Sequence, residues 1–299
     1  MTEEPTEKVR ERNFDADGPH EIDVSIHSGA VDVLLTDEPG ITVRVRHRPD
    51  AGNAWTSGIA NLMTWVSGLS GQFGQFGQAS VDDAVDQVRI ELQGKRLVVH
   101  APKGPMFQAF PLGVTVRAPA GSNVEVRSGS ADVLVTGAAG KMKVQTGSGE
   151  IKIDRADGAA MVTTGTGAVR LGPMLGGLQA RSGSGDVEVS SVGGTTALVT
   201  GSGDVWLGAV AADVMARTGT GDLTVADAAC GKIDLHTGSG EIRVGVRQGA
   251  TAEVDLSSGS GQARSELNLT DERPLAEPKL RVRGRTGSGT ALVTSALDG

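Results

Sequence analysis

The stretch TGSGEIKIDRADGAAMVTTGTGAVRL, residues 146–171, contains one short motif twice, and this motif decides the fold. It reads Ser or Thr, Gly, Ser or Thr, Gly and usually an acid, followed by two apolar residues at alternate positions. Copies begin at Ser128, Thr146, Thr164, Ser182, Thr200, Thr218 and Thr237, with degenerate copies at Ser258 and Thr286. The first six copies start 18 residues apart, and such a fixed period is typical of stacked-coil repeat proteins.

The apolar positions predict two strands in each repeat. Ile151 and Ile153 flank the polar Lys152 after the glycine turn, which is the period-two pattern of a half-buried strand. A second alternating run, such as Met142 and Val144, leads into the next turn, so the hydroxyl that opens the motif also points inward. A buried hydroxyl needs a partner, most simply a backbone group of the tight turn. The sequence therefore predicts an all-β, single-stranded β-solenoid whose 18-residue coils stack ~4.8 Å apart.

Three segments are expected along the chain. Residues 1–18 are polar and charged, which predicts a disordered tail. Residues 19–127 are predicted to form irregular coils that close the N-terminal end, with a helical insertion at residues 50–88. Residues 128–299 are predicted to form the regular solenoid and a C-terminal cap.

The helical insertion contains the first candidate interaction site. Residues 54–69 place apolar side chains at helical spacing, so the predicted helix either covers the open end of the solenoid or contacts a partner. Residues 51–80 contain no Lys or Arg, which argues against adsorption to anionic lipid. The candidate interaction residues are Trp55, Ile59, Leu62, Trp65, Val66 and Leu69.

An acidic column is the second candidate site. One motif position is acidic in successive coils, and only Ala168 interrupts it in the regular repeats. Carboxylates ~4.8 Å apart repel by roughly 1 kcal/mol even in water, and a bound Ca²⁺ would relieve this repulsion. The alternative is a solvated ladder near Lys152, Arg170 and Arg243, because calcium-binding nonapeptide repeats carry their motif at both turns of a coil. The column consists of Asp132, Glu150, Asp186, Asp204, Asp222 and Glu241.

Composition narrows the classes of function. The formal net charge of −8 argues against nucleic acid as a partner, because phosphate binding needs a basic face. No apolar run reaches the ~18 residues of a membrane span, and residues 1–12 do not resemble a signal peptide. With Cys230 as its one cysteine, the chain is expected to be cytoplasmic, without membrane insertion and without a cofactor other than the Ca²⁺ considered above.

Several passages resemble a known family. The repeat TGSGD(V/I)xV, the early segment SIHSGAVDVLL and the passage RIELQGKRLVVHAPKG are similar to the bacterial "putative adhesin" family of β-strand-repeat proteins, also called toastrack domains. The resemblance covers about residues 20–50 and 86–296. It implies a β-helix-like fold, and family members attached to membrane modules are linked with envelope-stress sensing.

These observations favour a non-catalytic scaffold or protein-interaction module, with a protein partner or a homo-oligomer. An apolar strip on the outward phase, formed by Met161, Ala197, Val199 and Met215, would supply the contact. One alternative is a ligand- or cation-responsive sensor that works with an envelope-stress partner. Another is a polysaccharide-acting β-helix enzyme, in which paired carboxylates would perform acid–base chemistry.

Overall fold

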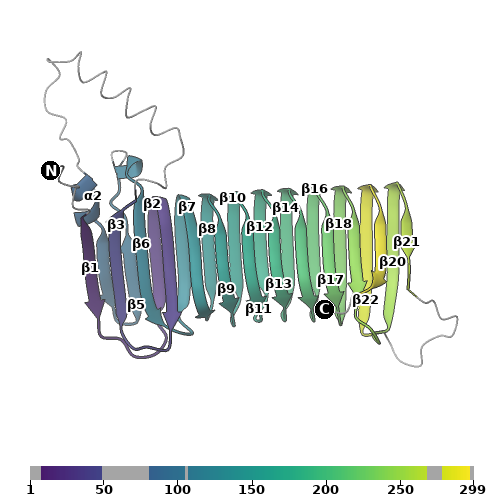
Figure 1. The fold of residues 1–299 in the computed structure, drawn as a ribbon, viewed down its shortest axis with the longest axis horizontal. Helices are drawn as coiled ribbons and strands as arrows, with labels where there is room; N and C mark the ends of the chain where they lie inside the picture. Colours follow the sequence, from purple (N-terminus) through teal and green to yellow (C-terminus); the bar gives the residue numbers. More distant parts are fainter. Residues whose placement is uncertain (1–7, 49–80, 105–106, 268–277, 297–299) are drawn as a thin grey trace, which may run out of the picture.

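Strands stack side by side along one axis and form the elongated rod of Figure 1. The computed structural model describes residues 8–48, 81–104, 107–267 and 278–296 of the chain. Before the regular coils lie β1 (Val9–Phe14), β2 (Glu21–Thr36), β3 (Ile41–His47), α2 (Val81–Asp86), β4 (Arg89–Gln93), β5 (Arg96–His100), the 3₁₀ turn η2 (Phe107–Ala109) and β6 (Leu112–Pro119).

The regular coils begin with one long strand and continue with two strands each. They comprise β7 (Asn123–Ala139), β8 (Met142–Ser148), β9 (Ile151–Ala156), β10 (Ala160–Thr166), β11 (Val169–Met174), β12 (Leu178–Ser184), β13 (Val187–Val192), β14 (Thr196–Ser202), β15 (Val205–Val210), β16 (Val214–Thr220), β17 (Leu223–Ala228), β18 (Gly231–Ser239) and β19 (Ile242–Val246). The C-terminal coils comprise β20 (Ala252–Ser260), β21 (Ala263–Ser265), β22 (Leu280–Ser288) and β23 (Ala291–Ser295).

Each coil contributes one strand to each of two walls. The first sheet contains, in spatial order, β5, β2, β7, β8, β10, β12, β14, β16, β18, β22 and β20. The second sheet contains β6, β2, β7, β9, β11, β13, β15, β17, β19, β23 and β21, because β2 and β7 are long enough to run through both. Parallel pairing places Met142 beside Ala160 and Val144 beside Val162, so equivalent residues stack as predicted. The predicted β-solenoid is confirmed.

The core consists of columns of identical positions from successive coils. Ile151, Val169, Val187, Val205 and Leu223 form one such column, and each is at most 3% exposed. The opening hydroxyl of the motif is buried in the same way. The hydroxyl of Thr146 donates to the carbonyl of Ser148 at 2.6 Å, and equivalent bonds recur in other threonine coils. The predicted turn partner of this hydroxyl is therefore confirmed.

Two coils are out of chain order. β2 lies between the β5–β6 coil and β7, because it pairs with all three strands. The last coil, β22–β23, lies between β18–β19 and β20–β21. Figure 1 shows this arrangement as the purple β2 among teal strands and the yellow β22 between two green ones. The coil at the C-terminal end of the rod is therefore β20–β21 and not the end of the chain.

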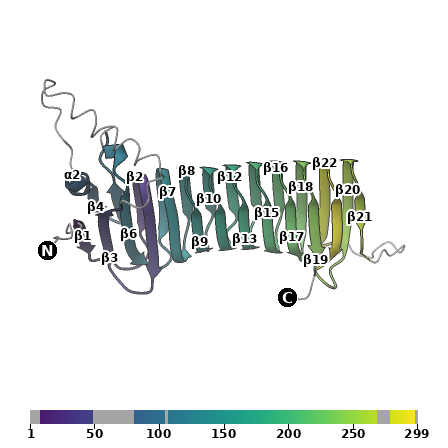
Figure 2. The ribbon, with the colours of Figure 1, turned by 45° about the horizontal axis from the view of Figure 1, so that its top comes forward.

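The N-terminal end of the rod is closed by antiparallel strands and a short helix (Figure 2). β4 and β5 form a hairpin, and α2 lies within the expected helical insertion. Val85 of α2 and the nearby Val88 are at most 1% exposed. The predicted tail at residues 1–18 was wrong for Val9–Phe14, which form β1 beside β3. This polar strand is held from outside the core, because Arg10 donates to the carbonyl of Val88 and Glu11 pairs with Arg44.

The candidate helix at residues 54–69, with Trp55, Ile59, Leu62, Trp65, Val66 and Leu69, lies outside the described residues. No helix among the described residues is long and apolar enough to cross a bilayer.

Candidate binding face on the first sheet

The outer surface of the first sheet carries two adjacent rows of side chains, set by the strict register of the coils. We call this surface the binding face. The upper row is Val98, Asp23, Glu125, Lys143, Met161, Gln179, Ala197, Met215, Asp234, Arg283 and Asp255. The lower row is His100, Ser25, Arg127, Gln145, Thr163, Arg181, Val199, Arg217, His236, Arg285 and Ser257.

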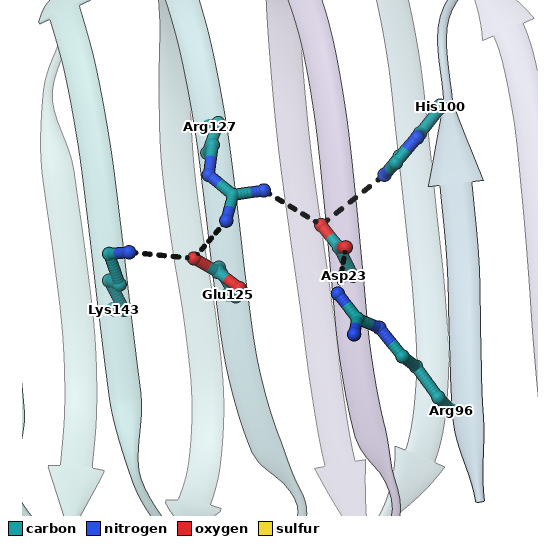
Figure 3. Close-up of polar contacts among 6 residues, drawn as sticks. All are labelled: Asp23, Arg96, His100, Glu125, Arg127 and Lys143. Atoms are coloured by element: carbon teal, nitrogen blue, oxygen red, sulfur yellow. Dashed lines mark hydrogen bonds and ion pairs between the residues drawn. The ribbon is translucent and has the colours of Figure 1, made fainter.

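A buried carboxylate stands at the N-terminal end of this face. Asp23 is only 4% exposed although its side chain points outward, because side chains from neighbouring coils cover it (Figure 3). Arg96 donates to Asp23 Oδ2 at 2.7 Å, and a guanidinium nitrogen of Arg127 lies 3.4 Å from Oδ1. His100 Nε2 lies 3.3 Å from Oδ1 but is not aligned for a hydrogen bond. Arg127 also forms an ion pair with Glu125, which extends the network to the next residue of the upper row.

The surroundings hold Asp23 in its ionised form. Burial alone would raise the pKa of this carboxyl, but the hydrogen bond from Arg96, the adjacent His100 and the charge of Arg127 outweigh it and leave the pKa lowered. A carboxylate with a lowered pKa is a poor proton acceptor. Its role in the described structure is to join the coils of β5, β2 and β7 through the side chains of Arg96 and Arg127.

Beyond the cluster the face becomes shallow and apolar. Glu125 forms an ion pair with Lys143 at 3.0 Å, and both residues, together with Asp23 and Arg96, line a groove of about 660 Å³ that runs towards Ala197. The groove exists because the coil corners beneath it are small, such as Gly176 and Gly177. Met161 and Ala197 of the predicted apolar strip line this groove. Val199, on the strand of Ala197, and Met215, on the next strand, extend the strip beyond it, and Met161, Val199 and Met215 are 38–44% exposed.

The lower row is cationic and lacks carboxylates. Arg181, Arg217 and Arg285 are exposed, and in the described part of the chain none of them makes an ion pair or a side-chain hydrogen bond. One coil lies between Arg181 and Arg217, and one lies between Arg217 and Arg285. Each pair is therefore two coil spacings apart, ~9.6 Å. His236 stands between the last two. These unpaired guanidinium groups frame Val199 and Met215.

On the second sheet, by contrast, most cationic side chains form ion pairs. Lys152 and Arg170 both pair with Glu150, and Arg243 pairs with Glu241. Arg247 at the same wall donates to both carboxylate oxygens of Asp227. Most cations of this wall are therefore neutralised by neighbouring acids, whereas Arg181, Arg217 and Arg285 of the binding face have no ion pair among the described residues.

The acidic column lies at the glycine turn between the two sheets, and most of its carboxylates accept backbone hydrogen bonds. Asp186 Oδ1 accepts the N–H of Asp204 at 2.9 Å, and Asp204 Oδ1 accepts the N–H of Asp222 at 2.8 Å. The same bond joins Asp132 to Glu150 and Asp222 to Glu241. The described residues contain no group of three or more His, Cys, Asp or Glu arranged to hold a metal ion. The structural role of these carboxylates is therefore to link successive turns.

We expect millimolar Ca²⁺ to leave the melting temperature unchanged, because one oxygen of each aspartate in the column is already used by a backbone N–H. Asp204→Ala should lower the free energy of unfolding by about 1 kcal/mol, since the Asp222 N–H loses its acceptor. Thermal melts with Ca²⁺, Mg²⁺ and chelator test this directly. A rise of several degrees that is specific for Ca²⁺ and lost in Asp204→Ala would establish the cation site instead.

Sequence reasoning placed the apolar strip and the acidic column correctly in the coil, but it did not find the Asp23 cluster or the arginine row. Asp23 meets Arg96 and Arg127 from coils 73 and 104 residues away in the sequence. A signal for the row was present, because Arg181 and Arg217 occupy the same position in repeats 36 residues apart.

The chain is similar to a known protein family and to several solved structures. The sequence matches Toastrack DUF4097 over residues 96–288. No curated protein matches the chain. The solved structure of a "putative adhesin" from Bacteroides fragilis is 12% identical, with a TM-score of 0.45, and covers 97% of this chain and 98% of its own. A second one, from Parabacteroides distasonis, is 11% identical, with a TM-score of 0.28 and coverage of 97% and 95%. Because the family match spans well over half of its length, the chain belongs to the Toastrack DUF4097 family.

Proposed function

We propose that this protein is a non-catalytic β-solenoid scaffold that binds an acidic protein partner through the binding face. The observation that carries the proposal is the row of unpaired guanidinium groups beside exposed apolar side chains. Arg181 and Arg217 flank Val199, and Met215 lies two residues before Arg217 on the same strand. Arginine offers a bidentate match to carboxylates, and aliphatic side chains beside it supply area that becomes dry on contact.

The two rows of the binding face contain six Lys and Arg side chains and four Asp and Glu side chains, so the face is net positive, whereas the chain as a whole has a net charge of −8. Charge segregation of this kind favours specific orientation and fast association with an acidic partner. The interval of ~9.6 Å between arginines is close to two turns of an α-helix, ~10.8 Å. An acidic helix lying along the rod therefore presents carboxylates at nearly the right spacing.

The two alternative functions have less support in the geometry. A cation-responsive sensor would use the acidic column, whose aspartates link successive turns. A polysaccharide-acting enzyme would need a carboxylate pair that changes protonation beside a sugar platform. Trp206 is exposed on the second sheet, but its stacked neighbours there are Glu188 and Thr224, without a second aromatic ring.

Site-specific photocrosslinking tests the proposal. A photoreactive residue at Val199 should give one defined protein adduct in source cells, and the same residue at Thr224 on the second sheet should not. The paired variant Arg181→Gln and Arg217→Gln should reduce the Val199 adduct at least tenfold, since two charge-assisted contacts are lost. Raising the salt concentration should lower the yield of the Val199 adduct as well, because salt screens the charges that attract the partner.

The matched control is Lys152→Gln with Arg170→Gln, which removes two cations from the second sheet. This variant should retain the Val199 adduct. Equal adducts at Val199 and Thr224, or an adduct that is insensitive to the loss of both arginines, would contradict the assignment of the binding face.

A further inference from the structure

The C-terminal end of the rod exposes a long unpaired strand edge. β20 pairs with β22 on one side only, and among the described residues no strand pairs with its other side. In the first sheet the N–H of each inward residue points towards the C-terminal end: Val124 donates to Lys141 and Gly231 donates to Lys279, both at 2.9 Å. The same pattern continued to β20 directs the N–H groups of its inward residues away from β22, to the side where the described part of the chain has no strand. Strand edges of this kind are templates for further strand pairing.

The core is also open at this end. The inward residues Ala252, Val254 and Leu256 of β20 are only partly buried, whereas Val282, which stacks on Val254, is 2% exposed. A cavity of about 740 Å³ lies against these side chains. In a solenoid each coil buries its apolar face against the next, and among residues 8–48, 81–104, 107–267 and 278–296 this last coil has no such neighbour.

The opposite end of the rod does not offer a matching surface. There the strands beyond β5 and β6 run antiparallel, and α2 covers them with fully buried Val85. Head-to-tail stacking would therefore place an open core against a closed one. Tail-to-tail contact avoids this mismatch. A two-fold axis brings the β20 edge of one copy against the β20 edge of the other, so both copies contribute the same open surface.

We propose that two copies of this chain associate tail to tail, with β20 pairing antiparallel to β20 of the second copy. The strand spans residues 252–260, so full overlap places Leu256 on the two-fold axis, opposite the partner's Leu256. Val254 then lies opposite the partner's Ser258. In this register the backbone groups that face solvent in one copy are the ones that bond across the interface, and two open cores become one.

The outward side chains of β20 fit the same register. Glu253 lies opposite the partner's Gly259, and Asp255 lies opposite the partner's Ser257, so no carboxylates face each other. Within each copy Arg281 and Arg283 already lie 3.3 and 3.1 Å from Glu253 and Asp255, which neutralises the acids next to the edge. A register centred on Asp255 would bring two carboxylates together and is disfavoured.

Sedimentation velocity and light scattering on the full chain test the dimer. The mass should rise with concentration to twice 30.5 kDa. Leu256→Lys should raise the dissociation constant about 100-fold, because two ammonium groups meet on the axis. Ser257→Lys is the matched control: it adds the same charge one residue away but faces the partner's Asp255, so dimerisation should be retained. A monomer at all concentrations, or a Leu256→Lys dimer of wild-type affinity, would overturn the proposal.

A disulfide test does not depend on whether Leu256→Lys folds. In a Cys230→Ala background, Leu256→Cys should form a disulfide-linked dimer in oxidised glutathione, because hydrogen-bonded antiparallel partners have Cα atoms about 5.5 Å apart. Val254→Cys faces a serine and should link far less. Preferential linking at position 254 would exclude this register. The association uses the free edge of β20, whereas the partner contact proposed above rests on Arg181, Val199 and Arg217 of β12, β14 and β16, so failure of one proposal does not decide the other.

Discussion

Gly185→Ala should destabilise the protein by roughly 3–5 kcal/mol, one of the largest effects expected of any single methyl group in this chain. Gly185 has φ +129°, a conformation that side chains rarely adopt, and an added Cβ would lie 2.3 Å from the carbonyl oxygen of Gly167 in the preceding coil. The methyl group cannot be accommodated by a rotamer change, because the obstacle is backbone. The coil must therefore move away from its neighbour, which breaks the stacking on which each coil depends.

Gly94→Ala is the matched control. Gly94 also has a positive φ, +58°, but nothing lies within 4 Å of an added Cβ. This residue stands in the β4–β5 turn, so the substitution should cost only about 1 kcal/mol of left-handed strain. Urea midpoints for the two variants separate the effects. A Gly185→Ala midpoint equal to that of Gly94→Ala would show that close stacking of the turns does not limit stability.

The same close stacking explains why the regular part of the fold could be predicted from sequence. Each coil repeats one local pattern, so Ile151 and Thr146 reveal their inward positions through the equivalent residues of other coils. The order of the terminal coils does not follow from this pattern. A coil presents similar apolar columns to whichever neighbour lies above it, so only the tertiary structure decides that β22–β23 enters between β18–β19 and β20–β21. β1 escaped prediction because its strand pairs through backbone and ion pairs without an apolar face.

The sequence predicted only those parts of the candidate site that stand out within a single repeat. Met161, Val199 and Met215 are anomalous in their own repeats, since polar residues usually occupy outward positions. Asp23 is not anomalous in its strand, where an outward acid is ordinary. Its burial arises from Arg96 of one neighbouring coil and Arg127 of the other, and this arrangement depends on the insertion of β2 between them. A pattern within one repeat contains no information about such a contact.

Asp23→Ala should lower the free energy of unfolding by about 2–3 kcal/mol at neutral pH. The substitution removes a hydrogen-bonded carboxylate that holds together the coils of β5, β2 and β7. The cost stays below that of a fully buried ion pair, because Arg96 and Arg127 are 50% and 43% exposed and can be solvated again. Glu125→Gln is the control: its partners Arg127 and Lys143 are also half exposed, so it should cost at most about 1 kcal/mol.

Asp23→Asn should remove part of the acid sensitivity of the wild type. The pKa of Asp23 is lowered in the folded chain, so its contribution to stability is fully present above the unfolded value of ~3.9 and is lost as the pH falls through the folded pKa. The neighbouring Arg96, His100, Glu125 and Arg127 are the same in both proteins, so the comparison isolates the carboxyl of Asp23. The difference in urea midpoint between wild type and Asp23→Asn should therefore be large at pH 7 and shrink progressively below pH ~4. A difference that is independent of pH would show that Asp23 stabilises the coils by packing and not as a carboxylate.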